Sequence, residues 1–382
     1  MVISQLLDAL KISGLMAWQI LWALILGFFL SSIIQALVKS KTISNLLGKD
    51  NIKSIFWATI FGAVSSSCSY AAVALAKTLW RKGASFSAAM AFEIASTNLV
   101  IELGIIIALL ISWQFTLAEF IGGPLMIIFV AVIFRLFLRK NLLNKAQVQA
   151  DKGLIGVMEG HAAMDMSIDI GGSLAKRLFS EQGVKSVSDI FVMEWAAVIK
   201  DILIGLLVAG ALAAWIPLSF WHSLFLSSSP LLANIWGPII GPLVSLISFV
   251  CSVGNIPLAA VLWNGGISFG GVISFIFADL IILPILFIYK KYYGLKMAFF
   301  ILISFYFAMV ISGYLIELLF HLFKIIPRRH QLAIYHLAIN WNYTTILNII
   351  FLLLAAWLVY IFIKNGSLPM LRMMNVGKNK MK

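Results

Sequence analysis

Runs of about 20 apolar residues, the length that a helix needs to cross a bilayer, recur along this chain. A soluble core could not bury them, because 62% of the 382 residues are hydrophobic and only 11% are charged, against about 25% in soluble domains. The chain is therefore predicted to be an all-α, polytopic membrane protein, which excludes a soluble enzyme. Simple spans are expected at 17–38, 86–112, 114–137, 194–216, 268–289, 297–320 and 343–364.

Two further apolar stretches, 54–80 and 237–263, are interrupted at their centres by the small polar segments SSSCSYA (65–71) and CSVGNIP (251–257). Basic residues flank 54–80 on both sides, and cytoplasmic loops attract such residues. An arm of 14 residues rises about 21 Å as a helix, less than the roughly 30 Å hydrocarbon core. Each stretch is therefore predicted to be a re-entrant hairpin that enters the membrane, turns and leaves on the same side.

The two interrupted stretches belong to an internal repeat. A shift of 183 positions aligns 65–101 with 248–284, and 12 of the 37 positions are identical without a gap. The same shift aligns 114–137 with 297–320 and brings 17–38 near 194–216. With both hairpins re-entrant, the two repeats have opposite orientations in the membrane. Inverted repeats with broken helices near the midplane are the layout of many secondary transporters.

These features divide the chain into four parts, namely a first membrane repeat (1–138), a cytoplasmic loop (139–193), a second membrane repeat (194–322), and an extra transmembrane helix with a basic tail (323–382). The net charge of +13 is explained by basic cytoplasmic loops, and no nucleic-acid partner is expected. The loop is expected to be solvated; a metal or regulatory cluster is the alternative for its residues Glu159, His161, Asp165 and Asp169.

The hairpin tips are the first candidate for a binding site. Non-helical backbone at membrane depth is tolerated where it lines a cavity or is buried in protein, and broken helices expose backbone groups that bind ligands. The candidate substrate-binding residues are Cys68, Ser69, Cys251, Ser252, Asn255, Ser96 and Asn98. The alternative for the two cysteines is packing, since free cysteine is commonly buried for that reason alone.

Acidic residues inside the predicted spans are the second candidate. Glu93 and Asp279 are expensive to place in lipid, and we expect them to couple transport to an ion; hydrogen-bonded helix packing is the alternative. Glu102 and Glu119 lie nearer the predicted outer interface and are expected to be structural. No nucleophile with a base and an orienting group is visible, so no enzyme activity, catalytic residue, resident metal or cofactor is predicted.

The segments SSSCSYAAVALAKTLW (65–80), FEIASTNLVIELGIII (92–107), WQFTLAEFIGG (113–123) and 251–294 resemble the predicted permease family that includes the organoarsenical efflux permeases. The resemblance covers about 54–138 and 190–300, and it implies a multi-pass exporter in a prokaryotic inner (plasma) membrane. In the characterised exporters of this family the substrates are trivalent organoarsenicals such as methylarsenite. Their first tip carries a Cys-x-Cys pair, whereas this chain has a single cysteine there, Cys68.

Trivalent arsenic prefers soft thiolate ligands, and Cys68 and Cys251 would supply one from each repeat. The leading function is a secondary transporter that exports a small soft or hydrophobic solute by alternating access around the tips, driven by the proton motive force. A metal-ion permease, a membrane thiol-redox enzyme and a non-transporting partner subunit are the alternatives. The expected partners are a small-molecule substrate and the lipid bilayer; a homo-oligomer is compatible with the sequence.

Overall fold

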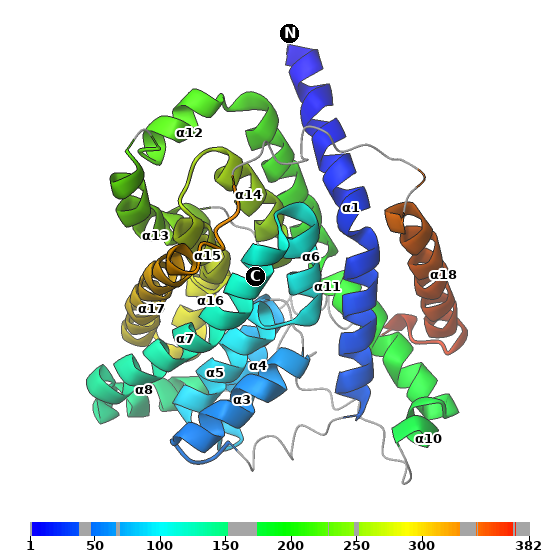
Figure 1. Ribbon diagram of the computed structural model, residues 1–382. Coiled ribbons are helices and arrows are strands. Elements are labelled where there is room, and N and C mark those ends of the chain that lie inside the picture. The colour runs from blue at the N-terminus through cyan, green and yellow to red at the C-terminus, as the bar shows by residue number, and fades with distance from the viewer. Residues whose placement is uncertain are drawn as a thin grey trace.

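The computed structural model describes residues 2–37, 47–65, 69–151, 174–227, 229–247, 252–328, 341, 343–369 and 371. Every regular element in these ranges is a helix, as the composition predicts (Figure 1). The elements are α1 (Val2–Leu37), α3 (Ile52–Ser65), α4 (Ser69–Arg81), α5 (Phe86–Asn98), α6 (Ile101–Leu110), α7 (Trp113–Phe137), α8 (Lys140–Ala150), α10 (Leu174–Leu178), α11 (Glu181–Trp215), α12 (Leu218–Leu224), α13 (Pro230–Leu246), α14 (Ser252–Asn264), α15 (Phe269–Phe277), the 3-10 helix η1 (Ala278–Leu280), α16 (Leu283–Tyr293), α17 (Leu295–Leu322) and α18 (Tyr343–Lys364).

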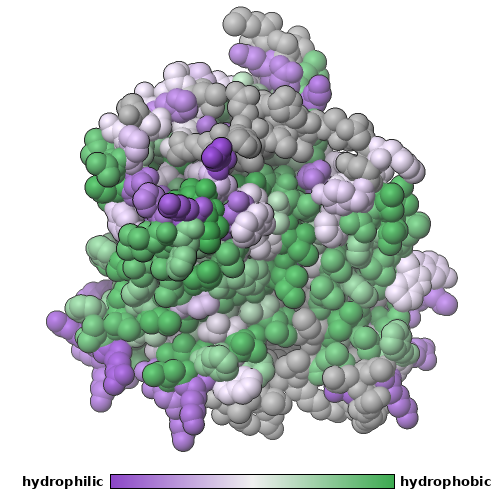
Figure 2. Space-filling view, in the orientation of Figure 1, coloured by the Kyte–Doolittle hydropathy of each residue, from purple (hydrophilic) through white to green (hydrophobic). Residues whose placement is uncertain are grey.

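The outer surface of the helices has the apolar character of a membrane protein. Five described helices or helix pairs are long and apolar enough to cross a bilayer, and a bent pair, α15–η1 with α16, makes a sixth. Large apolar side chains such as Ile128, Phe299 and Leu353 are more than half exposed. Figure 2 shows apolar residues over a broad band of the visible face, with hydrophilic residues gathered above and below it. This arrangement supports a multi-pass membrane protein.

The predicted span 194–216 lies in a helix that starts earlier than expected. The region is helical almost to its end, because α11 ends at Trp215. The helix that contains it, α11, begins at Glu181, inside the segment assigned to the loop. Ser180 caps this start, because its Oγ accepts a hydrogen bond from the backbone N–H of Gly183 at 3.0 Å.

Helix limits follow the internal repeat closely. Shifted by 183 positions, Ser69–Arg81 becomes 252–264, which is the range of α14. The same shift moves Trp113–Phe137 to 296–320, within α17. The gap between α5 and α6, at Leu99 and Val100, shifts to 282–283, which overlaps the gap between η1 and α16 at 281–282. The repeat seen in the sequence is therefore also a repeat of helices and helix breaks.

Equivalent helices of the two repeats pack against each other and run antiparallel. In α1 and α11, the Trp215 indole N–H donates to the carbonyl of Gln5 at 3.0 Å, so the end of one helix meets the start of the other. Toward the opposite end, Phe28 and Trp195 pack edge to face with ring centroids 5.1 Å apart. Figure 1 shows the two helices side by side.

The pair α7 and α17 repeats this arrangement. Phe134, near the end of α7, packs against Phe300, near the start of α17, at a centroid distance of 5.5 Å. Gly122, closer to the start of α7, lies against Ile316 in the second half of α17. The two long helices are therefore also antiparallel.

In each repeat the chain returns, after the interrupted stretch, to the place where it began. The backbone N–H of Ser85, after α4, donates to the carbonyl of Leu47, before α3, at 2.8 Å. In the second repeat, a Cβ atom added to Gly266, after α14, would lie 2.9 Å from Cβ of Ser227, before α13. The arms before and after each tip thus start and finish at one end of the molecule. Their placement in a membrane stays a prediction.

The second interrupted stretch begins earlier than expected. Helix α13 starts at Pro230 and not at 237. A proline is tolerated there because the first helical N–H needs no partner.

In the predicted cytoplasmic loop, the residues Glu159, His161, Asp165 and Asp169 lie outside the described residues. The cytoplasmic assignment of 139–193 stays a prediction.

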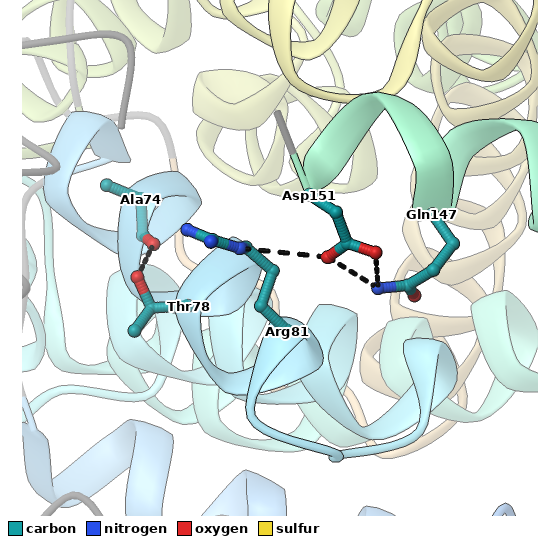
Figure 3. A network of polar contacts seen from close by, with 5 residues as sticks. All are labelled: Ala74, Thr78, Arg81, Gln147 and Asp151. Carbon is teal, nitrogen blue, oxygen red and sulfur yellow. Dashed lines mark hydrogen bonds and ion pairs between the residues drawn. The ribbon is translucent and has the colours of Figure 1, made fainter. Parts of the chain in front are cut away.

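A polar contact ties the end of α4 to α8 (Figure 3). The Arg81 guanidinium lies 3.8 Å from a carboxylate oxygen of Asp151, which also accepts from the Gln147 side-chain amide at 3.1 Å. Both ionic partners are partly exposed, so this ion pair contributes little to stability. It lies at the end of the molecule where the basic flanks of the first interrupted stretch gather.

Candidate substrate and ion site between the repeats

The two interrupted stretches meet at the first residues of α4 and α14. The backbone N–H of Ser252 approaches Ser69 Oγ at 3.4 Å, and Ser69 Oγ donates to Asp279 Oδ2 at 2.6 Å. All three residues are buried. Ser69 and Ser252 are equivalent positions of the repeat, so the contact joins the repeats where two half-helices begin. A helix start offers unpaired backbone N–H groups, which makes this junction suited to bind a ligand.

Asp279 reaches this junction because the span that carries it is broken. It lies in η1, between α15 and α16, and the two parts of this span are bent by 42°. Asn98 ends α5 at the equivalent break of the first repeat, and its side chain interacts with the Asp279 carboxyl. Asn98 Nδ2 also donates to Thr97 Oγ1 at 3.1 Å. Both spans were expected to be continuous; the breaks bring their polar residues together.

Glu93 links the two repeats a little further along α5. Its Oε1 accepts a hydrogen bond from the hydroxyl of Tyr289 on α16, and both side chains are fully buried. Its carboxyl is also close enough to Asp279 for the two to interact electrostatically. The sequence singled out Glu93 but not its partner, because Tyr289 occurs in the aromatic and basic run YKKYYG and has no distinguishing neighbour of its own.

Two other predicted site residues, Ser96 and Asn255, form hydrogen bonds within their own repeats. Ser96 Oγ donates to the Glu93 carbonyl of its own helix at 2.9 Å. Asn255 Nδ2 donates to Ser245 Oγ at 3.2 Å, which joins α14 to α13 within the second repeat. Ser252 contributes its backbone N–H, and no hydrogen bond of its hydroxyl is found among the described residues. Cys68 and Cys251 lie outside the described residues.

Glu119 and Glu102 were expected to be structural residues nearer the outer interface, and their depth in a membrane stays a prediction. The Glu119 side chain is fully buried on α7, and among the described residues neither of its carboxyl oxygens has a hydrogen-bond partner. It interacts electrostatically with Asp279. The Glu102 side chain lies against Gly27 of α1. No group of three acidic, histidine or cysteine side chains among the described residues is arranged to hold a metal ion.

An aromatic cluster lies at one end of the span that carries Glu93 and Asn98. Trp80 and Phe86, at the turn between α4 and α5, pack edge to face with centroids 4.9 Å apart. Tyr293 of the second repeat lies 5.6 Å from each of them. We call Trp80, Phe86 and Tyr293 the first aromatic corner. Beside it, the buried Lys77 ammonium lies 4.1 Å from the ring centroid of Tyr292.

A second aromatic cluster, at the equivalent turn of the second repeat, lies at the other end of that span. Trp263 and Phe269, at the turn between α14 and α15, pack with Phe115 of the first repeat at 5.0 and 4.5 Å. We call these three residues the second aromatic corner. The span Phe86–Leu110 starts at the first corner, and Phe115 follows its end. The two corners therefore lie at opposite ends of one span, with the junction between them.

Comparison with known proteins agrees with the family resemblance. The family model ArsP_1, described as "Predicted permease", matches residues 5–318. A Mycobacterium tuberculosis protein named "Putative permease Rv2963" is 60% identical over 337 residues, which cover 88% of this chain and 83% of that protein. The Escherichia coli "UPF0718 protein YraQ" is 24% identical over 145 residues, covering 38% of this chain and 41% of that protein. No solved structure matches this chain.

The family match spans both interrupted stretches, both aromatic corners and the residues at the junction, and it stops before α18. The resemblance read from the segments around the two tips is thereby confirmed. The chain belongs to the predicted permease family ArsP_1.

Proposed function

We propose that this permease is a secondary-active exporter of a small soft or hydrophobic solute, such as a trivalent organoarsenical, working by alternating access around the two tips. The observation that carries the proposal is the chain of contacts from Ser252 through Ser69 to Asp279. It joins two equivalent half-helix starts, one from each repeat, next to buried acidic residues. Secondary transporters bind substrates and coupling ions at such places.

The proposed architecture is a pair of inverted repeats, each with a re-entrant hairpin and placed in a prokaryotic inner membrane. Three observations support it. Equivalent helices pack antiparallel, in α1 with α11 and in α7 with α17. Each interrupted stretch starts and finishes at one end of the molecule. The two aromatic corners lie at opposite ends of the span Phe86–Leu110.

Alternating access requires that the path to the site open at one end at a time. In this proposal the first and second aromatic corners are the two gates. Each gate closes when an aromatic ring of one repeat, Tyr293 or Phe115, packs on the Trp–Phe pair of the other repeat. Rocking one repeat against the other would separate one ring from its pair and leave the other in place.

Glu93 and Asp279 are the proposed coupling residues. Each carries a buried carboxyl that bonds to the opposite repeat, Glu93 to Tyr289 and Asp279 to Ser69. A change in the charge of either carboxyl would therefore alter a contact that holds the repeats together. Moving a proton on or off such a group is a direct way to drive the exchange between two arrangements of the repeats.

The solute would be held by thiols at the tips. Methylarsenite in water is a methylarsenic dihydroxide, and each thiol that binds arsenic displaces one hydroxyl, which leaves as water with the thiol proton. Cys68 and Cys251 immediately precede Ser69 and Ser252 in the sequence. Those serines are in contact across the repeats, so we propose a site with one thiolate from each repeat.

The test is the growth of an arsenic-sensitive bacterial strain that expresses the protein, in methylarsenite, inorganic arsenite and an aromatic arsenical. Variants Cys68→Ser and Cys251→Ser and the double variant are compared with wild type at equal amounts in the membrane. We expect methylarsenite resistance from wild type and its loss in both single variants. Resistance that survives the double substitution would show that the thiols are not needed to bind the solute. If wild type gives no resistance to any arsenical, arsenicals are excluded as the substrate class.

The fate of the arsenical in the same cultures distinguishes transport from thiol-redox chemistry. A redox enzyme would alter the oxidation state of the arsenical in the medium, whereas an exporter lowers its amount in the cell. For a metal-ion permease, the described residues show no arrangement of three ligands that supports it.

A further inference from the structure

Hydrogen-bond acceptors outnumber donors in the polar region between the repeats. Counting only the residues that the structure describes, four side chains there have buried oxygens without a hydrogen-bond partner. These oxygens are Glu93 Oε2, Asn98 Oδ1, Asp279 Oδ1 and both carboxyl oxygens of Glu119. All four side chains are fully buried. Buried acceptors without donors cost free energy, so whatever satisfies them must bring hydrogen atoms or positive charge.

Glu119 is the most exceptional member of this group, because no group in the described part of the chain donates a hydrogen bond to it. Glu93 receives a bond from Tyr289, and Asp279 receives one from Ser69. Asn98 contacts Thr97 and the Asp279 carboxyl. A glutamate kept only for packing between helices would be expected to have a donor, as polar groups in membrane helices usually do.

Close packing of α7 holds Glu119 beside both helix breaks. Gly122 and Gly123 lie three and four residues further along α7, on the same face as Glu119. A Cβ atom added to Gly123 would lie 2.5 Å from Leu99 Cδ2, at the break between α5 and α6. One added to Gly122 would lie 2.9 Å from Phe277 Cζ, just before η1. The two glycines thus let the Glu119 face of α7 approach the breaks of both repeats.

The helices packed against α7 carry three other buried carboxyls, Glu93 on α5, Glu102 on α6 and Glu317 on α17. A fourth, Asp279, lies in η1 directly after α15, which also packs against α7. Asp279 is the one with which Glu119 interacts electrostatically. No lysine, arginine or histidine pairs with Glu119 in the described part of the chain. The acidic groups are also not arranged as three ligands of one metal ion. A proton, which needs a single oxygen, fits where a metal ion does not.

We propose that Glu119 is a third proton-carrying group of the transport site, which exchanges its proton with the Asp279 carboxyl and the proton gradient. This deepens the proposed function, since it adds a coupling residue to Glu93 and Asp279. The step forms an O–H bond on Glu119 as the O–H bond of the donor breaks; the donor is the Asp279 carboxylic acid, which is left as a carboxylate, or a hydronium ion, which is left as water. Only a proton moves, and no oxidant or reductant takes part.

The first test needs no transported solute. Infrared difference spectra are recorded on the purified full chain in lipid while the pH is changed, and the carbonyl stretch of carboxylic acids reports proton exchange. We expect Glu119→Gln to remove one component of this band. Glu317→Gln is the matched control, because Glu317 is a buried acid on the equivalent long helix whose Oε2 already accepts from the Gly270 N–H at 2.5 Å. It should leave the Glu119 component in place.

A spectrum of Glu119→Gln identical to wild type would overturn the proposal, and so would a band that responds to sodium at constant pH but not to pH. If Glu119→Gln does not fold, Glu119→Asp replaces it, and the band component should shift in frequency. An unshifted component in folded Glu119→Asp, judged by size-exclusion elution, also rejects the assignment.

The second test uses proteoliposomes with an imposed proton gradient and methylarsenite. Glu119→Gln should lose gradient-driven accumulation at least tenfold while it retains exchange of labelled for unlabelled solute. If wild type does not move methylarsenite but the spectral component disappears in Glu119→Gln, the proposed substrate fails and the proton site stands. If wild type is coupled to the gradient and Glu119→Gln behaves like it, the proton site fails and the transporter stands.

Discussion

Ser69→Ala and Ser252→Ala should have very different effects on stability, although the two serines occupy equivalent positions of the repeat. The Ser69 hydroxyl donates to Asp279 at 2.6 Å and lies 3.4 Å from the Ser252 backbone N–H. A hydrogen bond to an acidic group is worth about 1.5–3 kcal/mol, and the longer contact adds up to about 1 kcal/mol. We therefore expect Ser69→Ala to lower the free energy of unfolding by about 2–4 kcal/mol.

Ser252→Ala keeps the backbone N–H that makes the contact, and no hydrogen bond of the Ser252 hydroxyl is found in the described part of the chain. Its cost should stay below about 1 kcal/mol. Unfolding in mixed detergent micelles, titrated with SDS and followed by tryptophan fluorescence, measures both values. Equal losses for the two variants, or a wild-type value for Ser69→Ala, would contradict the assignment of Ser69 as the hydroxyl that joins the repeats.

Three further substitutions test other contacts by the same unfolding measurement. Tyr289→Phe keeps the ring but removes the donor to Glu93, and should cost about 1–3 kcal/mol; a double-mutant cycle with Glu93→Gln that shows no coupling would contradict this. Asn348→Ala removes two hydrogen bonds between α18 and the α1 backbone, at 2.9 and 2.8 Å, and should cost about 2 kcal/mol or more, so a near-neutral result counts against it. Tyr292→Leu removes the ring face under Lys77 and should cost about 1–2 kcal/mol more than Tyr292→Phe, which keeps it; equal effects would exclude the ring contact.

The repeat was the part of the fold that the sequence predicted best. Identical residues such as Trp80 and Trp263 gave the shift of 183 positions, and the helices α4 and α14 have limits related by that shift. Residue types that break helices and avoid lipid are local properties, so the position of each tip could be read from the sequence. The contact between Ser69 and Asp279 is consistent with the prediction that the tips belong to a shared site.

The helix breaks could not be predicted in the same way. The segment STNLVIEL (96–103) contains neither glycine nor proline, and its apolar residues suit a continuous span. The break at Leu99 and Val100 arises where α7 packs against it through Gly123, a contact between residues distant in the sequence.

The same contact explains why the burial of Glu119 could not be predicted. Counting residues from the start of its span placed it near the membrane surface, because a helix rises about 1.5 Å per residue. Depth along a helix, however, does not say which face is buried. The glycines that follow Glu119 bring its face against the breaks, and that face is therefore interior.

Because α1 and α11 are equivalent helices that run antiparallel, the proposed topology requires an even number of membrane crossings between them. The broken span α5–α6 and α7 supply two in that topology, in which α3 and α4 return to their own side. Adding or deleting a single crossing before α11 would then turn the second repeat over and separate Ser69 from Asp279. An insertion engineered between the repeats must therefore keep the number of crossings even, whereas the length of the loop matters less.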